Sequence, residues 1–185
     1  MTYQQYWEKI YQQSEKMNSI IASYWHEYSG LSTWQFWVVL ALLVSPLVLL
    51  YFTVDRSNIF EMLFFGYTVH ILWTYIDIVL ERYSYFVHMY FIAPMFPHAL
   101  NMTASVLPVA FLLLYQYCLT HRKNFFLYTI VLSAIFSFIL VPIEIASDLA
   151  KIEKGMKLYY IFFIDIAIAY VAYLLTKFVR NLAKN

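Results

Sequence analysis

The chain has few of the residues that build soluble domains or covalently linked scaffolds. Only 12% of its 185 residues are charged, and it contains three glycines, five prolines and one cysteine. About a quarter of the residues in a soluble domain are charged, so a soluble domain is excluded. A lone cysteine, Cys118, excludes disulfide scaffolds and CxxC motifs, and scarce glycine excludes collagen-like and linker sequences. A net charge of +1 offers no basic footprint for nucleic acid.

The sequence is instead rich in apolar residues: 63% of its residues are hydrophobic and 21% are aromatic. A membrane-spanning helix needs about 20 mostly apolar residues. Such stretches lie at about 34–54, 59–80, 99–120, 124–143 and 158–177. The sequence therefore predicts an all-α membrane protein, a bundle of about five transmembrane helices with the lipid bilayer as its first partner.

The segments outside these spans predict two further features. Within residues 1–30, apolar side chains recur at helical spacing among Gln, Glu and Lys, which predicts an amphipathic helix at the membrane interface. Residues 31–185 then form a single transmembrane domain. The aromatic stretch 83–98 is broken by Pro94 and Pro97, which predicts an interfacial or partly re-entrant connection in place of a sixth span.

The distribution of basic residues predicts the orientation. On the side opposite the N-terminus, basic residues occupy short connections or lie beside span ends, where the positive-inside rule has most force. They are Arg56, Arg122, Lys123, Lys177, Arg180 and Lys184. We therefore expect the N-terminus outside and the C-terminus in the cytoplasm of a cell-membrane protein.

Polar residues within the spans are costly and usually face a protein interior or a water-filled cavity. His70, Asp77 and Glu81 fall within roughly 40° on one helical face. Glu144 and Asp148 share a second face, and Asp165 lies on the last span. Because neighbouring spans run antiparallel, most of these residues should meet in one leaflet. The candidates for binding a cation or proton are His70, Asp77, Glu81, Asn101, Glu144, Asp148 and Asp165.

This acidic cluster has two interpretations. One is a half-cavity that holds a small cation, relays protons through His70, or receives a basic head group or peptide. The other is a set of polar side chains that neutralise one another and serve only to fix how the helices pack. Arg82 directly follows Glu81, and Lys151, Lys154 and Lys157 flank the fourth loop. We expect these cations, with Arg82 as the main charge partner, to compensate the carboxylates.

A second, weaker candidate site combines imidazole and thioether groups, which are ligands that suit copper(I). Its members are His88, Met95, His98 and Met102. Ordinary aromatic and methionine packing is the alternative, because methionine commonly fills gaps in apolar cores. The sequence predicts no cofactor.

Catalysis has little support, because the chain has no GxSxG, HExxH or phosphate-loop motif. Three classes of function stay open. The first is a non-enzymatic membrane protein that binds or conducts a small cation or proton. The second is an accessory or scaffold subunit that contacts another membrane protein or a second copy of itself. The third is a membrane enzyme that acts on lipid.

Two span ends carry a family resemblance. The second span ends in Ile76-Asp77-Ile78-Val79-Leu80-Glu81-Arg82-Tyr83, and the fourth ends in Pro142-Ile143-Glu144-Ile145 before a basic, aromatic stretch to Tyr160. Over residues 35–178 the chain resembles a family of small, uncharacterised multi-spanning membrane proteins of spore-forming Firmicutes. The resemblance implies a helical bundle in a bacterial cell membrane and a sporulation context, and it implies no reaction.

Overall fold

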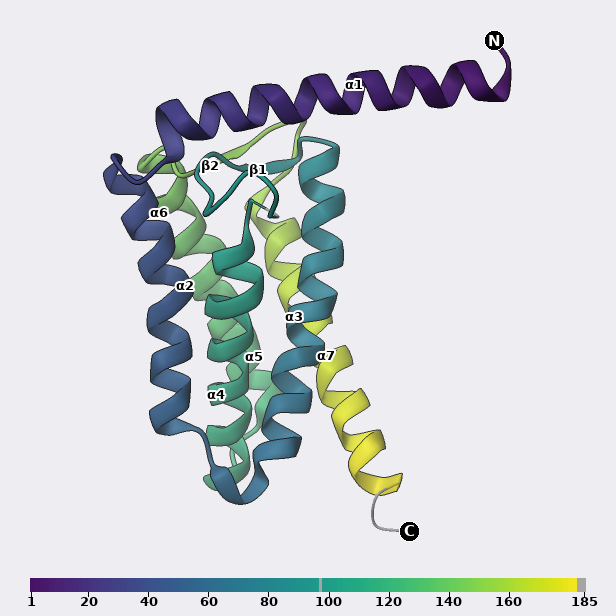
Figure 1. The fold of residues 1–185 in the computed structure, drawn as a ribbon. Coiled ribbons are helices and arrows are strands. Elements are labelled where there is room, and N and C mark those ends of the chain that lie inside the picture. The colour runs from purple at the N-terminus through teal and green to yellow at the C-terminus, as the bar shows by residue number, and fades with distance from the viewer. Residues whose placement is uncertain (97, 183–185) are drawn as a thin grey trace.

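The computed structural model describes residues 1–96 and 98–182, and shows an almost wholly helical chain (Figure 1). The α-helices are α1 (Tyr3–Tyr24), α2 (Trp34–Thr53), α3 (Ile59–Arg82), α4 (Leu107–Thr120), α5 (Phe125–Ile135), α6 (Val141–Ala146) and α7 (Leu158–Leu182). Two short strands, β1 (Phe86–His88) and β2 (Ala150–Ile152), accompany the helices. Lys184 and Pro97, which entered the predictions of orientation and of the 83–98 connection, lie outside the described residues.

Five continuous helical stretches are long and apolar enough to cross a membrane, as the sequence predicts. They are Trp34–Thr53, Arg56–Arg82, Met102–Thr120, Phe125–Ala146 and Leu158–Leu182. Two of them contain a π-helical turn, η3 (Met102–Val106) before α4 and η4 (Phe136–Leu140) between α5 and α6. The predicted boundaries hold to within a few residues, since hydropathy sets the length of a span while local capping sets its ends.

Polar side chains supply that capping at the end of the bundle that holds the α2–α3 and α4–α5 connections. Asp55 Oδ1 accepts a hydrogen bond from the Ser57 backbone N–H at 2.9 Å, which turns the chain from α2 into α3. Asn124 Oδ1 accepts from the backbone N–H groups of Phe126 and Leu127 and so begins α5. Such caps satisfy backbone donors that a helix end leaves free.

The core of the bundle is aromatic where α3, α4, α5 and α7 meet. Phe65 stacks on Tyr115 with ring centroids 4.5 Å apart, and Phe125 stacks on Tyr173 at 5.0 Å. Gly66 allows α3 to approach α4, because a Cβ atom there would lie only 2.7 Å from Leu112 Cδ1. Close approach at a small residue is a common way for membrane helices to pack.

The connections beyond α3 and α6 form a feature that the sequence did not predict. β1 and β2 pair antiparallel, with Phe86 opposite Ile152 and His88 opposite Ala150, at the end of the bundle that α1 crosses (Figure 1). Part of the predicted re-entrant connection is therefore a strand. Each strand has three residues, too few for an alternating pattern to stand out in an aromatic segment.

The helix α1 lies across this same end of the bundle, roughly perpendicular to the spans in Figure 1. None of its side chains is buried. Its C-terminal end is fixed to the segment after β1, because Tyr24 donates to the Met89 carbonyl and Trp25 Nε1 donates to the Phe91 carbonyl, each at 3.0 Å. Ser29 adds a pair of hydrogen bonds with the Phe91 backbone.

Candidate functional site

Three carboxyl groups from three helices line one enclosed cavity inside the bundle. They are Asp77 of α3, Glu144 of α6 and Asp165 of α7, with 3%, 5% and 0% of their surface exposed. The cavity, here called the acid cavity, has a volume of about 30 Å³. That volume holds about two water molecules. The structure thus brings together three of the residues that helical phase and span direction predicted to meet.

The two π-helical turns shape the walls of the acid cavity. Met102 and Thr103 come from η3, and Phe136 and Leu140 come from η4. Ser137, also on η4, is fully buried and lies 3.5 Å from Asp165 Oδ2, toward which it donates. Inserted π turns often occur at functional sites, because they redirect side chains within an otherwise regular helix.

The carboxyl groups of the acid cavity are short of partners. One oxygen of each is buried without a hydrogen-bond partner, namely Asp77 Oδ2, Glu144 Oε2 and Asp165 Oδ1. Across residues 1–96 and 98–182, none of the three forms an ion pair. An unpaired buried carboxylate is expensive by several kcal/mol, so these groups need a proton or a cation to be stable in this form.

The predicted compensation by basic residues is wrong for these three carboxyl groups. Arg82 is exposed, because it lies one residue beyond Glu81 and so about 100° around α3. Lys151 pairs with Glu153 at 2.6 Å, and Lys154 donates to the Tyr83 carbonyl at 2.6 Å. Lys157 is exposed. These four cations therefore lie at the surface, where water solvates them, and none of them neutralises the acid cavity.

The one imidazole in the wall of the acid cavity belongs to His88 of β1, which is 6% exposed. Burial lowers the pKa of His88 to about 4, while the nearby Glu81 opposes this change. The imidazole is therefore neutral at pH 7. It is held against the Phe86 ring, with centroids 4.7 Å apart. Pairing of β1 with β2 is what places His88 in the wall.

Glu81 lies one helical turn beyond Asp77, toward the β1–β2 end, and is partly exposed. His98 Nδ1 lies 2.7 Å from Glu81 Oε1, and both side chains retain about a fifth of their surface, 22% and 19%. The His98 ring also stacks on Phe91, with centroids 4.0 Å apart. Glu81 and His98 thus form a polar pair between the acid cavity and the surface that α1 crosses.

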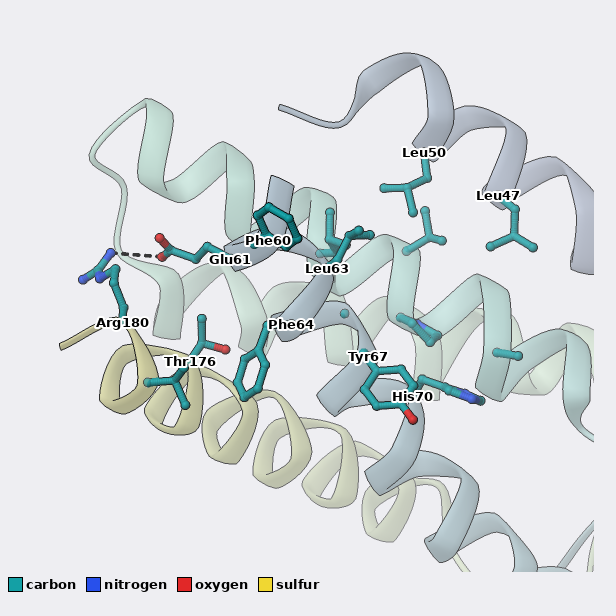
Figure 2. A pocket seen from close by; sticks show the side chains of 16 residues that line it. Leu47, Leu50, Phe60, Glu61, Leu63, Phe64, Tyr67, His70, Thr176 and Arg180 are labelled. Carbon is teal, nitrogen blue, oxygen red and sulfur yellow. Dashed lines mark hydrogen bonds and ion pairs between the residues drawn. The ribbon is translucent and has the colours of Figure 1, made fainter. Parts of the chain in front are cut away.

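His70 lies outside the acid cavity. It shares a helical face with Asp77, as predicted, but seven residues separate the two along α3, which is about 10 Å. His70 lines a second hollow, here called the lateral groove, between α2 and α3 (Figure 2). Its Nδ1 lies 2.8 Å from the Thr103 carbonyl, which can only accept, so Nδ1 carries the proton. Thr103 lines the acid cavity as well.

Two further predicted residues do not join the cluster. Asn101 is 4% exposed, and its Oδ1 has no partner, but it is not part of the acid-cavity wall. Asp148 is exposed in a turn with φ of 56° after α6 has ended at Ala146. The predicted helical face of Glu144 and Asp148 is therefore wrong, because the helix stops between them.

The structure also does not bring together the four residues of the weaker candidate copper(I) site. Met95 is 80% exposed, whereas His88 and Met102 line the acid cavity and His98 pairs with Glu81. Within the described ranges, no three His, Cys, Asp or Glu side chains are grouped so that they could hold a metal ion.

Sequence reasoning missed Thr103 and the ion pair between Glu61 and Arg180. Arg180 Nη1 donates to Glu61 Oε1 at 3.0 Å, and Tyr115 donates to the same oxygen at 2.5 Å. Only the three-dimensional crossing of α3, α4 and α7 brings these residues together, since 119 positions separate Glu61 from Arg180. A backbone carbonyl such as that of Thr103 leaves no signal in the sequence.

No family model, no curated protein and no solved structure matches this chain.

Proposed function

We propose that this chain is a multi-pass membrane protein that reversibly binds protons in the acid cavity. The observation that carries the proposal is the convergence of Asp77, Glu144 and Asp165 on one small cavity in which none of them forms an ion pair with a described residue. A proton on each carboxyl group removes the cost of burying its charge. The volume of about 30 Å³ favours a proton, a water molecule or a small ion over any organic substrate.

The route of proton access runs through the polar pair at the β1–β2 end. Glu81 follows Asp77 by one helical turn on α3, and His98 lies within hydrogen-bond distance of Glu81. Both side chains are partly exposed, so they reach water while standing next to the buried acids. Exchange of protons between the surface and Asp77 through this pair is shorter than any path from the opposite end of α3.

Infrared spectroscopy of the full chain in lipid vesicles tests proton binding directly. A protonated carboxyl group shows a C=O stretch that an ionised carboxylate lacks. We expect this band at pH 7 and a weaker band in Asp77→Asn and in Asp165→Asn. Asp148→Asn is the matched control, because it removes an exposed acid at the same end of the bundle and should leave the band unchanged.

Two outcomes would contradict the proposal. Absence of a protonated-carboxyl band at pH 7 would mean that the acids are ionised. A band that appears only when Na⁺ or K⁺ is removed would assign the cavity to a small cation, which is the second candidate ligand.

The same proposal extends to the placement of the chain in a cell membrane. Tyr6, Ile10, Met17 and Ile20 are exposed on α1, and α1 crosses the ends of the spans (Figure 1). We assign α1 to the membrane interface, where such side chains enter the boundary between head groups and acyl chains. The N-terminus is then outside and the C-terminus cytoplasmic, in keeping with the basic residues at the far end.

Cysteine labelling in intact cells tests this orientation after Cys118 is replaced by serine. Ser57→Cys and Lys123→Cys lie in the two connections at one end of the bundle, and Lys154→Cys lies at the other end. We expect an impermeant thiol reagent to label Lys154→Cys from outside and to leave the other two unlabelled until the cells are opened. The reverse pattern would invert the orientation.

A further inference from the structure

The lateral groove has a volume of about 780 Å³, far larger than the acid cavity. Leu47 and Leu50 of α2 face Leu63 and Phe64 of α3 across it, and Figure 2 shows these side chains along its length. Pro108 and Leu112 of α4 also line it. Because α2 packs on α4 and η3 while α3 packs on α4 and α7, the groove stays open between the two spans.

The groove extends through one half of the bilayer. Glu61 lines one end and His70 lines the other, and their nine-residue separation along α3 corresponds to about 14 Å. The hydrocarbon core of a bilayer is about 30 Å thick. The length of the groove therefore matches the chain of a lipid in a single leaflet, with its head at Glu61 and its tail end at the depth of His70.

The surface end of the groove is basic. Arg180 lines this end together with its ion-pair partner Glu61, to which its Nη1 donates. Its Nε is buried, but 36% of the side-chain surface is exposed, so Nη2 is the donor left for an incoming oxygen atom. Arg56, Lys123 and Lys177 are exposed at the same end of the bundle. Arginine suits phosphate oxygens because its planar fork presents paired donors.

The geometry points to a binding site for an anionic phospholipid. Its phosphate is held at Arg180, and one acyl chain lies in the lateral groove between α2 and α3 as far as His70. This site is independent of the acid cavity, which lies at the other end of α3.

A flexible chain fits the groove better than a helix of a partner protein does. A helix is a rigid cylinder about 10 Å across. An acyl chain is thinner and adapts to the uneven walls that Phe60, Leu63 and Tyr67 provide.

Native mass spectrometry of the full chain tests the site. The protein is reconstituted in vesicles of equal parts phosphatidylglycerol and phosphatidylcholine and released into detergent. We expect one retained phosphatidylglycerol with roughly tenfold preference, because its phosphate keeps a net negative charge, whereas the choline ammonium of phosphatidylcholine offsets that charge. Arg180→Gln combined with Glu61→Gln, which leaves no stranded charge, should abolish the preference. Lys123→Gln removes one charge at the same end but outside the groove and should keep it.

A second pair of variants tests the acyl-chain site while the ion pair stays intact. Leu63→Trp fills the groove and should abolish lipid retention, whereas Leu127→Trp on the exposed face of α5 should not. Diacylglycerol, which lacks the phosphate, should be retained no better than phosphatidylcholine. Equal retention of both phospholipids by the wild type, or loss of the preference in Lys123→Gln, would overturn the site. Exclusion of lipid by a second copy of the chain would overturn it too.

Discussion

The carboxyl groups of the acid cavity and of the lateral groove differ in their hydrogen-bond and ion-pair partners. In the groove, Glu61 receives hydrogen bonds from both Arg180 and Tyr115. In the acid cavity, Asp77, Glu144 and Asp165 share no basic partner, and each keeps a buried oxygen without a hydrogen bond. A carboxyl group therefore has a cationic partner at one site and none at the other.

This difference separates a charge that shares its cost with a partner and water from acids that share it with neither. Glu61 and Arg180 keep 18% and 36% of their side-chain surface exposed, so water shares the cost of their charges. The acids of the cavity have no such access. Unpaired ionisable groups inside a membrane protein are costly to keep and mark candidate functional sites. The comparison predicts that breaking the Glu61 pair is costly, while neutralising the cavity acids is not.

The largest expected effect comes from charging His88 inside the acid cavity. Burial lowers the pKa of His88 to about 4, below its ordinary value of 6.5. Between those values the unfolded chain binds a proton that the folded chain does not, so this contribution to stability is complete above pH 6.5 and lost as the pH falls toward 4. The shift corresponds to about 3 kcal/mol.

Urea unfolding of the wild type and of His88→Gln at pH 7 and pH 4.5 isolates this loss, because the protonated acids of the cavity contribute equally to both proteins. On going to pH 4.5, His88→Gln should become more stable relative to the wild type, because glutamine takes up no proton. His121→Gln replaces an exposed histidine at the other end of the bundle and should leave the difference as in the wild type. An unchanged pH dependence in His88→Gln would mean that His88 is not neutral in the fold.

The second-largest effect on stability comes from leaving the Glu61 charge without its partner Arg180. Arg180→Gln removes its charged donor and should lower the free energy of unfolding by about 2 kcal/mol, less than for a fully buried pair because both groups are partly exposed. Adding Glu61→Gln to Arg180→Gln should restore about half of the loss, since no charge is then left alone. A double variant no more stable than the single one would show that packing of Arg180 matters more than its charge.

Much of the fold follows from the sequence because each span has its own local signal. Runs such as Trp34–Thr53 are apolar over their whole length, and antiparallel alternation then places the ends of the second and fourth spans together. The short strand at His88 and the π turns of η3 and η4 have no such signal. They depend on contacts between segments that lie far apart in the chain.

The candidate site could be predicted only in part for a similar reason. Helical phase predicts that Asp77, Glu144 and Asp165 meet, and they do so because each is buried on the inner side of its own helix. Phase alone cannot separate His70 from Asp77, which differ in depth and not in direction. Adjacency in sequence also misleads for Arg82, since the residue after Glu81 points away from it around the helix.

A smaller effect is expected at the rim of the acid cavity. Glu81→Gln removes one charge from the partly exposed pair with His98 and should cost about 1 kcal/mol of unfolding free energy. Its effect on proton access should be larger. After a pH jump, the infrared change of the buried carboxyl groups should be slower in Glu81→Gln than in the wild type. Glu153→Gln, which alters an exposed ion pair at the same end, is the control.

The smallest expected effect on stability comes from neutralising the acids of the cavity, in contrast to removing the partner of Glu61. Asp77→Asn, Glu144→Gln and Asp165→Asn each preserve the shape of a protonated carboxyl group and remove only its acidity. Because none of the three acids has a basic partner to strand, each variant should change the free energy of unfolding by less than about 1 kcal/mol. Thermal unfolding in detergent, with and without Na⁺, K⁺ and Ca²⁺, measures this. A loss of stability comparable to that of Arg180→Gln, or a midpoint that rises with one cation in the wild type and not in the variants, would show that the acids are ionised around a bound ion.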